Sequence, residues 1–317
     1  MVMRFSLRQI EYFVAAGDEG SILLASERLN ISSASVSTAI SQLETAFGIQ
    51  LFIRHHAQGL SLTSEGRRFL TESKRLLAQV AGMHGFADEM AREARGPLAV
   101  GCLVVFAAIV LPSLRSGFEA ENPGVLWSST FANQALLLDK LRSAEIDVAL
   151  TYDLDIPKDI AFEPLARLKA HALIAEGHAL AKRRSVSLAE LARLPMILLD
   201  LPLSREYFLG LYQAADVTPV IRERVADYHV LRSLVANGFG YSLGNIRPLS
   251  QAADDGKLLR SLPLADLHRP MLLGVATARE GFRPKVISAF EAHCRATIND
   301  ESIPGMAPPL AEEGGRP

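Results

Sequence analysis

One pentapeptide in the sequence has the residue types of a nucleophilic active site. Gly240-Tyr241-Ser242-Leu243-Gly244 matches GxSxG, in which a serine on a tight strand-to-helix turn attacks a carbonyl carbon. The acids and histidines that could complete a triad follow in the chain order of a hydrolase: Asp254 or Asp266, then His268 or His293. A helical pattern precedes the motif, however, and Pro248 blocks a helix after it. A serine hydrolase using Ser242 is therefore the alternative function.

Small hydrogen-bonding side chains gather on one face of an expected helix near the N-terminus. Apolar residues recur at helical spacing from about Ser33 to Ala46, with Ser32 as N-cap, and must face inward. These apolar residues are Val36, Ile40, Leu43 and Phe47. The outward face has no large apolar residue and carries Ala34, Thr38, Ser41, Gln42 and Thr45. Hydroxyl and amide groups of this size can hydrogen-bond to base edges in the DNA major groove.

Neighbouring elements would hold this helix in a DNA-binding arrangement. A short helix at 21–29, capped by Ser21, precedes it across a three- to four-residue turn, which is typical of a helix-turn-helix. An ordinary helical hairpin is the alternative for the pair alone. A wing favours DNA binding: Leu51, Phe52 and Arg54 form one strand, 55–59 a turn, and 60–62 the return strand.

Residues 6 to 66 resemble the winged helix-turn-helix of the LysR-type transcriptional regulators. The resemblance depends on matches at fixed spacing: Leu7, Arg8, Phe13, Gly20, Ser21, Ala25, Leu29, Ser32, Val36, Ser37, Ile40, Leu43, Glu44, Gly48, Leu51, Phe52, Arg54, Leu62, Thr63 and Gly66. It implies a regulator rather than an enzyme, with a linker helix and a two-lobed α/β effector domain similar to periplasmic binding proteins. Ser33 and Ala34 depart from the usual Gln-Pro of the family, and Thr38 and Ser41 stand where basic residues are frequent.

The candidate DNA-binding residues lie on the second helix and the wing. They are Ser32, Ser33, Ser35, Ser37, Thr38, Ser41, Gln42, Arg54, His55 and His56. Arg54 and the two histidines are candidates for phosphate or minor-groove contact. The histidine pair could instead bind a metal, but no further ligands can be placed, so we expect no metal site. Residues 1–66 hold four arginines and six acids, so several copies must act together on DNA.

A heptad pattern in the next helix predicts how copies associate. Positions 69, 73, 76, 80, 83, 87 and 90 step by four and three alternately, and Ser73 interrupts the seam. The seam residues expected in a homodimer or homotetramer are Phe69, Leu76, Val80, Met83 and Met90. A helix buried against its own domain is the alternative. A dimer is favoured because a palindromic operator needs a two-fold reader.

Composition limits the remaining possibilities. The 317 residues suggest two or three domains at about 150 residues each. Thirty-three Lys and Arg against 35 Asp and Glu exclude a highly basic histone-like binder and an acidic disordered chain. Two cysteines far apart and an N-terminus without an apolar signal core predict a cytoplasmic protein and disfavour an exported solute-binding protein. We expect no cofactor and no membrane span.

The rest of the chain alternates strand-like runs with helical stretches, which predicts a mostly parallel, doubly wound sheet. Candidate effector contacts follow the strands: Cys102, Leu103, Asn133, Tyr152, Ser204, Arg205 and Tyr228. Arg205 at a helix start could anchor a carboxylate, although a solvated surface arginine is the alternative. Apolar Leu103 and Val105 suggest that the carboxylate carries an apolar or aromatic body.

The expected organisation is a DNA-binding domain at 1–63, a dimerisation helix at 64–95, an effector domain at 96–297 and a disordered tail at 298–317. Within the effector domain, lobe I takes 97–164 and 268–297, and lobe II takes 165–267. The partners expected are double-stranded DNA, a small-molecule effector, further copies of the chain and, for an activator, RNA polymerase.

Overall fold

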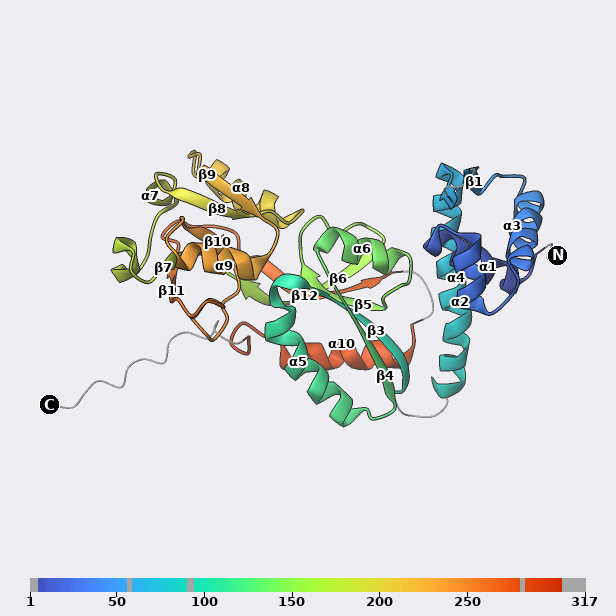
Figure 1. The fold of residues 1–317 in the computed structure, drawn as a ribbon. Coiled ribbons are helices and arrows are strands. Elements are labelled where there is room, and N and C mark those ends of the chain that lie inside the picture. Colours follow the sequence, from blue (N-terminus) through green and yellow to red (C-terminus); the bar gives the residue numbers. More distant parts are fainter. Residues whose placement is uncertain (1–4, 56–58, 90–93, 280–282, 304–317) are drawn as a thin grey trace. The chain divides into compact units, whose positions relative to one another are not determined.

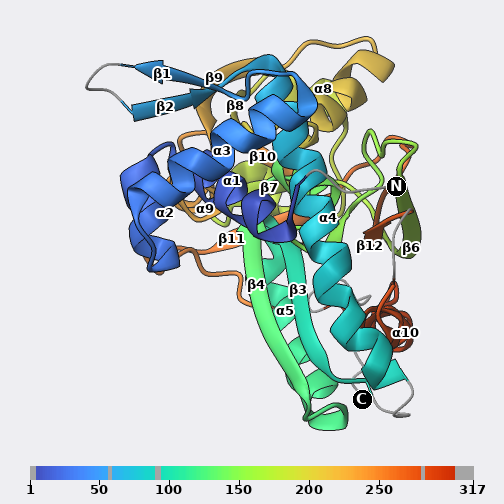
Figure 2. The same cartoon turned by 90° about the vertical axis from the view of Figure 1, so that its right-hand side faces the viewer.

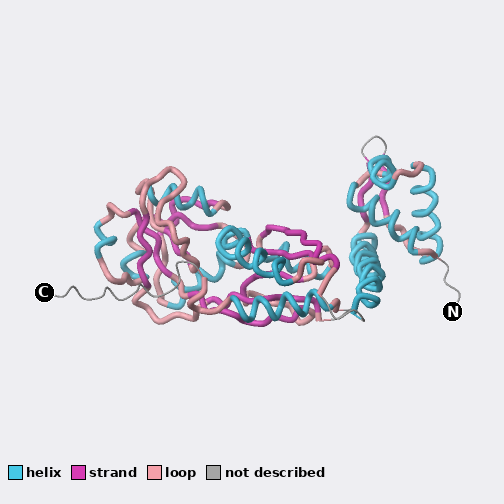
Figure 3. The backbone as a smooth tube through the Cα atoms, turned by 90° about the horizontal axis from the view of Figure 1, so that it is seen from below, coloured by secondary structure: helices cyan, strands magenta, loops and turns pink. Residues whose placement is uncertain are grey.

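The computed structural model describes residues 5–55, 59–89, 94–279 and 283–303. The chain divides into two compact units. The first is built on residues 1–93 and includes the short segments 142–145 and 281–284. The second holds the remainder, from Ala94 onward. Helices dominate the first unit, whereas strands run through both halves of the second (Figure 3).

The first unit is a winged helix-turn-helix followed by a long helix. Its elements are α1 Leu7–Glu19, α2 Ile22–Leu29, α3 Ser33–Phe47, β1 Phe52–His55, β2 Gly59–Leu62 and α4 Ser64–Glu89. Ser21 and Ser32 cap α2 and α3 as the sequence predicted, and Thr63 Oγ1 accepts a hydrogen bond from Gly66 N at 2.8 Å at the start of α4. The β1–β2 hairpin projects from the helices as the wing (Figure 2).

The wing is attached at the turn between α1 and α2. Leu60 N donates to Gly20 O at 2.8 Å. Gly59 has φ +90°, and a Cβ there would lie 2.9 Å from the same oxygen, so only glycine fits at this contact. Leu51 lies before β1 rather than within it, and His55 extends β1 to pair with Gly59.

Burial of the α3 apolar face follows the sequence pattern except at its end. Val36, Ile40 and Leu43 are at most 1% exposed. The prediction that Phe47 faces inward was wrong, since it is 41% exposed. Phe47 is the last residue of α3, and its ring packs at the edge of the domain against Phe5 and Phe69 at centroid distances of 5.1 and 4.8 Å.

The start of the expected α4 seam has partners in its own domain. Phe69 contacts the Phe13 ring at 5.2 Å, and Leu76 packs on the same core. Ser73, the residue that interrupts the heptads, is 3% exposed. Phe69 and Leu76 are thus partly buried in their own domain, and their part in a dimer stays a prediction. Val80 is half-buried, the Met83 side chain is not described, and Met90 lies outside the described residues.

A five-stranded sheet forms the first half of the second unit. Its order is β4-β3-β5-β12-β6, with β3 Gly96–Leu103, β4 Val125–Ala132, β5 Val148–Tyr152, β6 Ile160–Leu168 and β12 Met271–Ala278. Helices α5 Val104–Glu121 and α10 Lys285–Thr297 cover one face, and α6 Gln134–Arg142 covers the other (Figure 1). Strand β12 runs antiparallel to both neighbours, so the sheet is mixed rather than mostly parallel.

The second half of the second unit combines parallel and antiparallel strands. Its strands are β7 His171–Ala175, β8 Pro195–Leu199, β9 Val220–Val225, β10 Ser242–Gly244 and β11 Leu259–Pro263. Its helices are η1 Ala179–Lys182, α7 Leu188–Leu191, α8 Ser204–Ala214 and α9 Tyr228–Ala236. Strands β8 and β9 are parallel, while β7 lies antiparallel between β10 and β11. Every described helix is too short or too polar to cross a bilayer.

The expected disorder of 298–317 was wrong for its first residues. Ile298 and Ile303 are 4% and 2% exposed and belong to the core of the five-stranded half. Asp300 Oδ1 accepts a hydrogen bond from Arg167 N of β6 at 2.6 Å. Two isoleucines thus tie this short segment to the sheet despite its polar composition. Residues 304–317 lie outside the described residues.

Ile303→Ala should lower the free energy of unfolding of the second unit by about 2–5 kcal/mol, because it removes buried side-chain volume. Leu267→Ala, at a fully exposed side chain, is the control and should change stability by less than about 0.5 kcal/mol. Denaturant unfolding followed by circular dichroism measures both. Equal midpoints for the two variants would mean that Ile303 is not part of the core.

Burial of His171 predicts a pH dependence of stability. The imidazole is 1% exposed, and burial, together with the nearby Arg247 charge, lowers its pKa to about 3. The unfolded chain takes up this proton near pH 6.5, while the folded chain does not. Stability should therefore be unaffected above pH 6.5 and should fall by up to about 1.4 kcal/mol per pH unit below it. His171→Gln should flatten this slope between pH 6 and 4.5, and an unchanged slope would contradict the assignment.

Candidate nucleic-acid interface and ligand-binding region

The outward face of α3 is exposed and polar. Ser35, Thr38, Ser41 and Gln42 are all exposed, and Ala34 and Thr45 lie on the same side. An open depression of about 690 Å³ is lined by Gln9, Ser37, Thr38, Ser41, Gln42, Thr45 and Ala46. Four of the predicted DNA-binding residues, Ser37, Thr38, Ser41 and Gln42, therefore meet on one surface. Their hydroxyl and amide groups can exchange hydrogen bonds with base edges.

The first serines of α3 have structural partners. Ser32 Oγ accepts from Ser35 N at 3.2 Å and lies 2.8 Å from Ser35 Oγ. Ser33 Oγ lies 2.9 Å from Ser26 Oγ, and Ser26 is 4% exposed in α2. Ser32 thus caps the helix, and Ser33 joins the two helices across the turn. The polar surface for a partner begins after them, from Ser35 onward.

Helix α1 contributes to the same surface, which sequence reasoning missed. Gln9 Nε2 donates to Gln42 Oε1 at 2.5 Å. Arg8, Gln9 and Tyr12 also line a second depression that continues along α3 past Ala34 and Ser35. The available signal was Ser6-x-x-Gln9, a capping box that fixes where the side chain of the third helical residue lies.

The acids of the first unit are largely engaged in internal contacts. Glu44 Oε1 accepts from Leu51 N at 2.8 Å and from Phe52 N at 3.3 Å, so its carboxylate holds the entry to the wing. Asp18 lies 2.8 Å from Lys74 Nζ, and Glu19 lies 3.1 Å from Arg28 Nη1. Three of the six acids in residues 1–66 are therefore engaged in contacts within the first unit.

Arg54 and His55 lie in the first strand of the wing, where each pairs with a residue of the second strand. Arg54 pairs with Leu60, and His55 pairs with Gly59. The structure does not describe the Arg54 and His55 side chains, and His56 lies outside the described residues. Within the described chain, no group of three or more histidines, cysteines or acids is arranged to hold a metal.

Several candidate effector residues are buried in the core of the second unit. Cys102 is fully buried and Leu103 is 2% exposed, so neither faces an open site in this structure. Burial raises the pKa of the Cys102 thiol and keeps it protonated. Asn133 caps α6, because its Oδ1 accepts from Leu136 N at 3.0 Å.

The two halves of the second unit meet at Tyr152. Tyr152 is 1% exposed, and its hydroxyl donates to Asn245 Oδ1 at 3.1 Å. Tyr228 belongs to the same region, since its hydroxyl donates to Ile246 O at 3.4 Å. The segment at 245–247 is therefore in contact with predicted effector residues from β5 and α9.

Arg205 has acidic partners of its own. It lies at the start of α8 beside Ser204, which is 7% exposed. Its guanidinium bonds to Asp200 Oδ1 at 2.5 Å and also pairs with Glu206. The hydrogen bond to Asp200, followed by that to Glu206, raises the pKa of Arg205. An incoming carboxylate would have to compete with two carboxylates already in place.

Arg247 differs from Arg205 because its charge has no acidic partner among the described residues. Its Nε is buried without a hydrogen bond, and burial lowers the pKa of the guanidinium. Arg232 is a second buried cation: it donates to Ser250 O and Ala252 O and lies 5.9 Å from the Tyr228 ring centroid. Neither arginine followed from the sequence, because the pattern did not reveal which cations are buried.

The GxSxG interpretation was wrong. Ser242 is fully buried in strand β10, and its hydroxyl has only a 3.4 Å contact with Leu243 O among the described residues. The proposed triad partners are engaged elsewhere. Asp254 contacts His229, Asp266 accepts from Leu188 N, His268 accepts from Ala170 N, and His293 contacts Leu114 O.

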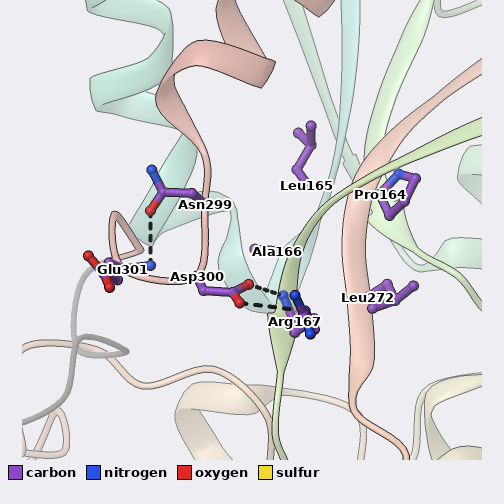
Figure 4. A pocket seen from close by; sticks show the side chains of 8 residues that line it. All are labelled: Pro164, Leu165, Ala166, Arg167, Leu272, Asn299, Asp300 and Glu301. Carbon is purple, nitrogen blue, oxygen red and sulfur yellow. Dashed lines mark hydrogen bonds and ion pairs between the residues drawn. The ribbon is translucent and has the colours of Figure 1, made fainter.

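A large depression lies away from these residues, along β6. It has a volume of about 710 Å³ and is lined by Pro164, Leu165, Ala166, Arg167, Leu272, Asn299, Asp300 and Glu301 (Figure 4). Arg167 Nε lies 3.6 Å from Asp300 Oδ2, so the cation in its wall is already paired. The depression follows from the packing of segment 298–303 beside the sheet and holds none of the predicted effector residues.

Two protein-family profiles match most of the chain. The profile described as "LysR substrate binding domain" matches residues 91–299. The profile described as "Bacterial regulatory helix-turn-helix protein, lysR family" matches residues 7–67. The chain is also similar to the HTH-type transcriptional regulator YnfL of Escherichia coli (strain K12), with 29% identity over 269 residues that cover 83% of this chain and 89% of YnfL.

Solved structures agree with these matches. HinK, a LysR family transcriptional regulator from Pseudomonas aeruginosa, is 35% identical with a TM-score of 0.64 and covers 93% of this chain and 99% of HinK. CbnR, whose full-length structure was solved with its target DNA, has a TM-score of 0.64 at 20% identity, which shows a common fold. The chain belongs to the LysR family and is a DNA-binding transcriptional regulator with an effector-binding domain, not a serine hydrolase.

Proposed function

We propose that this regulator reads DNA with the exposed face of α3 and responds to a small carboxylate bound where the two lobes meet. The observation that carries the first part is the polar surface formed by Ser37, Thr38, Ser41 and Gln42 beside a projecting wing. An α-helix enters the major groove with such a face toward the bases. Arg54, His55 and His56 remain proposed phosphate contacts. The protein acts in the cytoplasm, where the chromosome is.

Association of copies is part of this proposal. Residues 1–66 contain four arginines and six acids, so one copy has little attraction for DNA phosphates. Two linked copies raise the effective concentration of the second winged helix at its half-site. We assign the contact to the part of α4 from Val80 through Met83, because the preceding seam residues pack within their own domain. Phe69 and Leu76 support this dimer contact indirectly, because their packing on the core of the first unit fixes the direction of α4.

The second part of the proposal moves the carboxylate anchor from Arg205 to Arg247. Arg205 is neutralised by Asp200 and Glu206, whereas Arg247 is partly buried with no acid beside it among the described residues. A buried cation without a counter-charge is costly, and a bound carboxylate would relieve that cost. Tyr228, which is partly exposed and contacts the segment at 245–247, would supply apolar surface for the body of the ligand.

Thr38→Glu tests the DNA-binding face. The side chain is exposed, so the fold should persist, but a carboxylate facing DNA is repelled and should weaken binding by several kcal/mol. Fluorescence anisotropy of the full-length protein on a duplex selected from a random library measures the change. Gln213→Glu adds the same charge at an exposed site on α8 and should leave affinity unchanged. Equal affinity for the two variants would remove α3 from the interface.

Arg247→Met tests the anchor. The variant keeps a long side chain and removes the charge, so affinity for the acid should fall by about 2–5 kcal/mol. Calorimetry with a panel of aromatic and aliphatic acids identifies a ligand of the wild type and then measures both variants. Arg205→Met is the matched control and should cost less, because its charge is already paired. The reverse order of losses would return the anchor to Arg205, and a cognate effector without charge would overturn the carboxylate.

A further inference from the structure

The side-chain amide of Gln9 can have only one orientation at its contact with Ser6. Ser6 N lies 2.7 Å from Gln9 Oε1, and Ser6 Oγ lies 3.2 Å from the same oxygen. A backbone N–H can only donate a hydrogen bond, so the Gln9 atom facing it must be the carbonyl oxygen. The Gln9 amide nitrogen is then left to point away from Ser6.

This orientation determines which end of the Gln42 amide faces outward. Gln9 Nε2 donates to Gln42 Oε1 at 2.5 Å, so the carbonyl of Gln42 is turned toward α1. Gln9 is the only hydrogen-bond partner of the Gln42 side chain among the described residues, and Gln42 is otherwise exposed. The amide N–H groups of Gln42 are therefore the part left for another molecule.

We propose that Gln9 is a positioning residue that makes Gln42 read base-edge acceptors in the major groove. The available partners are N7 and O6 of guanine, O4 of thymine and N7 of adenine. A free glutamine prefers adenine by accepting from N6 and donating to N7 together. Here the Gln42 carbonyl accepts from Gln9 and is turned toward α1, which leaves the amide N–H groups facing outward. Gln42 therefore favours guanine on the strand it faces and disfavours cytosine, which presents a donor.

This inference rests on the proposed DNA-binding face of α3 and adds a residue that does not itself need to touch DNA. Ser6 and Gln9 form the capping box of α1, and Gln42 lies 33 residues away on α3. Hydrogen bonds thus connect three groups in series: the Ser6 backbone N–H, the Gln9 side-chain amide and the Gln42 side-chain amide. A change of hydrogen-bonding character at Gln9 should be transmitted to the base that Gln42 contacts.

Gln9→Glu is the decisive variant because glutamate keeps the capping box but cannot donate. A carboxylate at this position still accepts from Ser6 N, as in the common S-x-x-E form of the box. Its second oxygen can only accept from Gln42 Nε2, so the Gln42 amide must turn over and present its carbonyl outward. The preferred base on the contacted strand should then change from guanine toward cytosine or adenine, whose amino groups donate.

The measurement is selection of the full-length protein and its variants on a randomised duplex library, followed by sequencing and anisotropy on the enriched sequences. Gln42→Ala first identifies the base pair, because preference should relax there alone. Gln9→Glu should then invert that preference by about tenfold or more. Gln9→Met, which breaks both hydrogen bonds, should relax the preference without inverting it. Thermal unfolding should match the wild type for Gln9→Glu, since the cap is kept.

The double variant Gln9→Glu, Gln42→Ala separates the added charge from the reorientation. It should show no inversion, and the general loss of affinity from the added carboxylate should appear equally on all sequences. Unchanged base preference in Gln9→Glu overturns the positioning role, while readout by Gln42 stands. Unchanged preference in Gln42→Ala overturns the inference together with that readout. Enrichment of no sequence by the wild type would instead refute the proposed DNA-binding face.

Discussion

Burial of three residues on one side of α3 fixes the rotation of this helix, and the DNA-reading surface depends on that rotation. Val36, Ile40 and Leu43 are almost fully buried, and the side chains on the opposite face of the helix therefore face outward. The serine caps and the Ser26–Ser33 contact then hold the beginning of α3 against α2. A loss of this apolar packing would change the direction of every outward-facing side chain at once.

The second unit is organised by a different constraint, the balance of charge in its interior. Arg205 is paired with Asp200 and Glu206. Arg232 is buried against backbone carbonyls and the Tyr228 ring, and Arg247 is partly buried; neither has an acidic partner among the described residues. His171 stays neutral in the same region, because its burial and, after that, the nearby Arg247 charge lower its pKa. Among the described residues, this part of the fold therefore holds buried positive charge without an acidic partner.

Local patterns in the sequence were enough to predict the helix-turn-helix, its caps and the burial of Val36, Ile40 and Leu43, because these depend on residues a few positions apart. Features that depend on distant pairing were not predictable. The antiparallel β12 and the contact of Asp300 with Arg167 join segments more than 100 residues apart. Phe69 matched a dimer seam by spacing alone, since periodicity does not say which surface a stripe covers. The Gln9–Gln42 contact was not predicted either, because the two residues lie 33 positions apart on different helices.

The order of strands in the five-stranded sheet has a consequence for synthesis of the protein on the ribosome. Strand β12 lies between β5 and β6, yet it leaves the ribosome after the whole of the intervening lobe. The winged helix can fold as soon as it emerges, and the strands from β7 to β11 form a continuous segment that can follow. The five-stranded sheet cannot be completed until residues 271–278 are synthesised, because β12 pairs with both β5 and β6. A nascent chain stopped before residue 271 would carry a folded winged helix-turn-helix and an effector domain whose five-stranded sheet lacks β12.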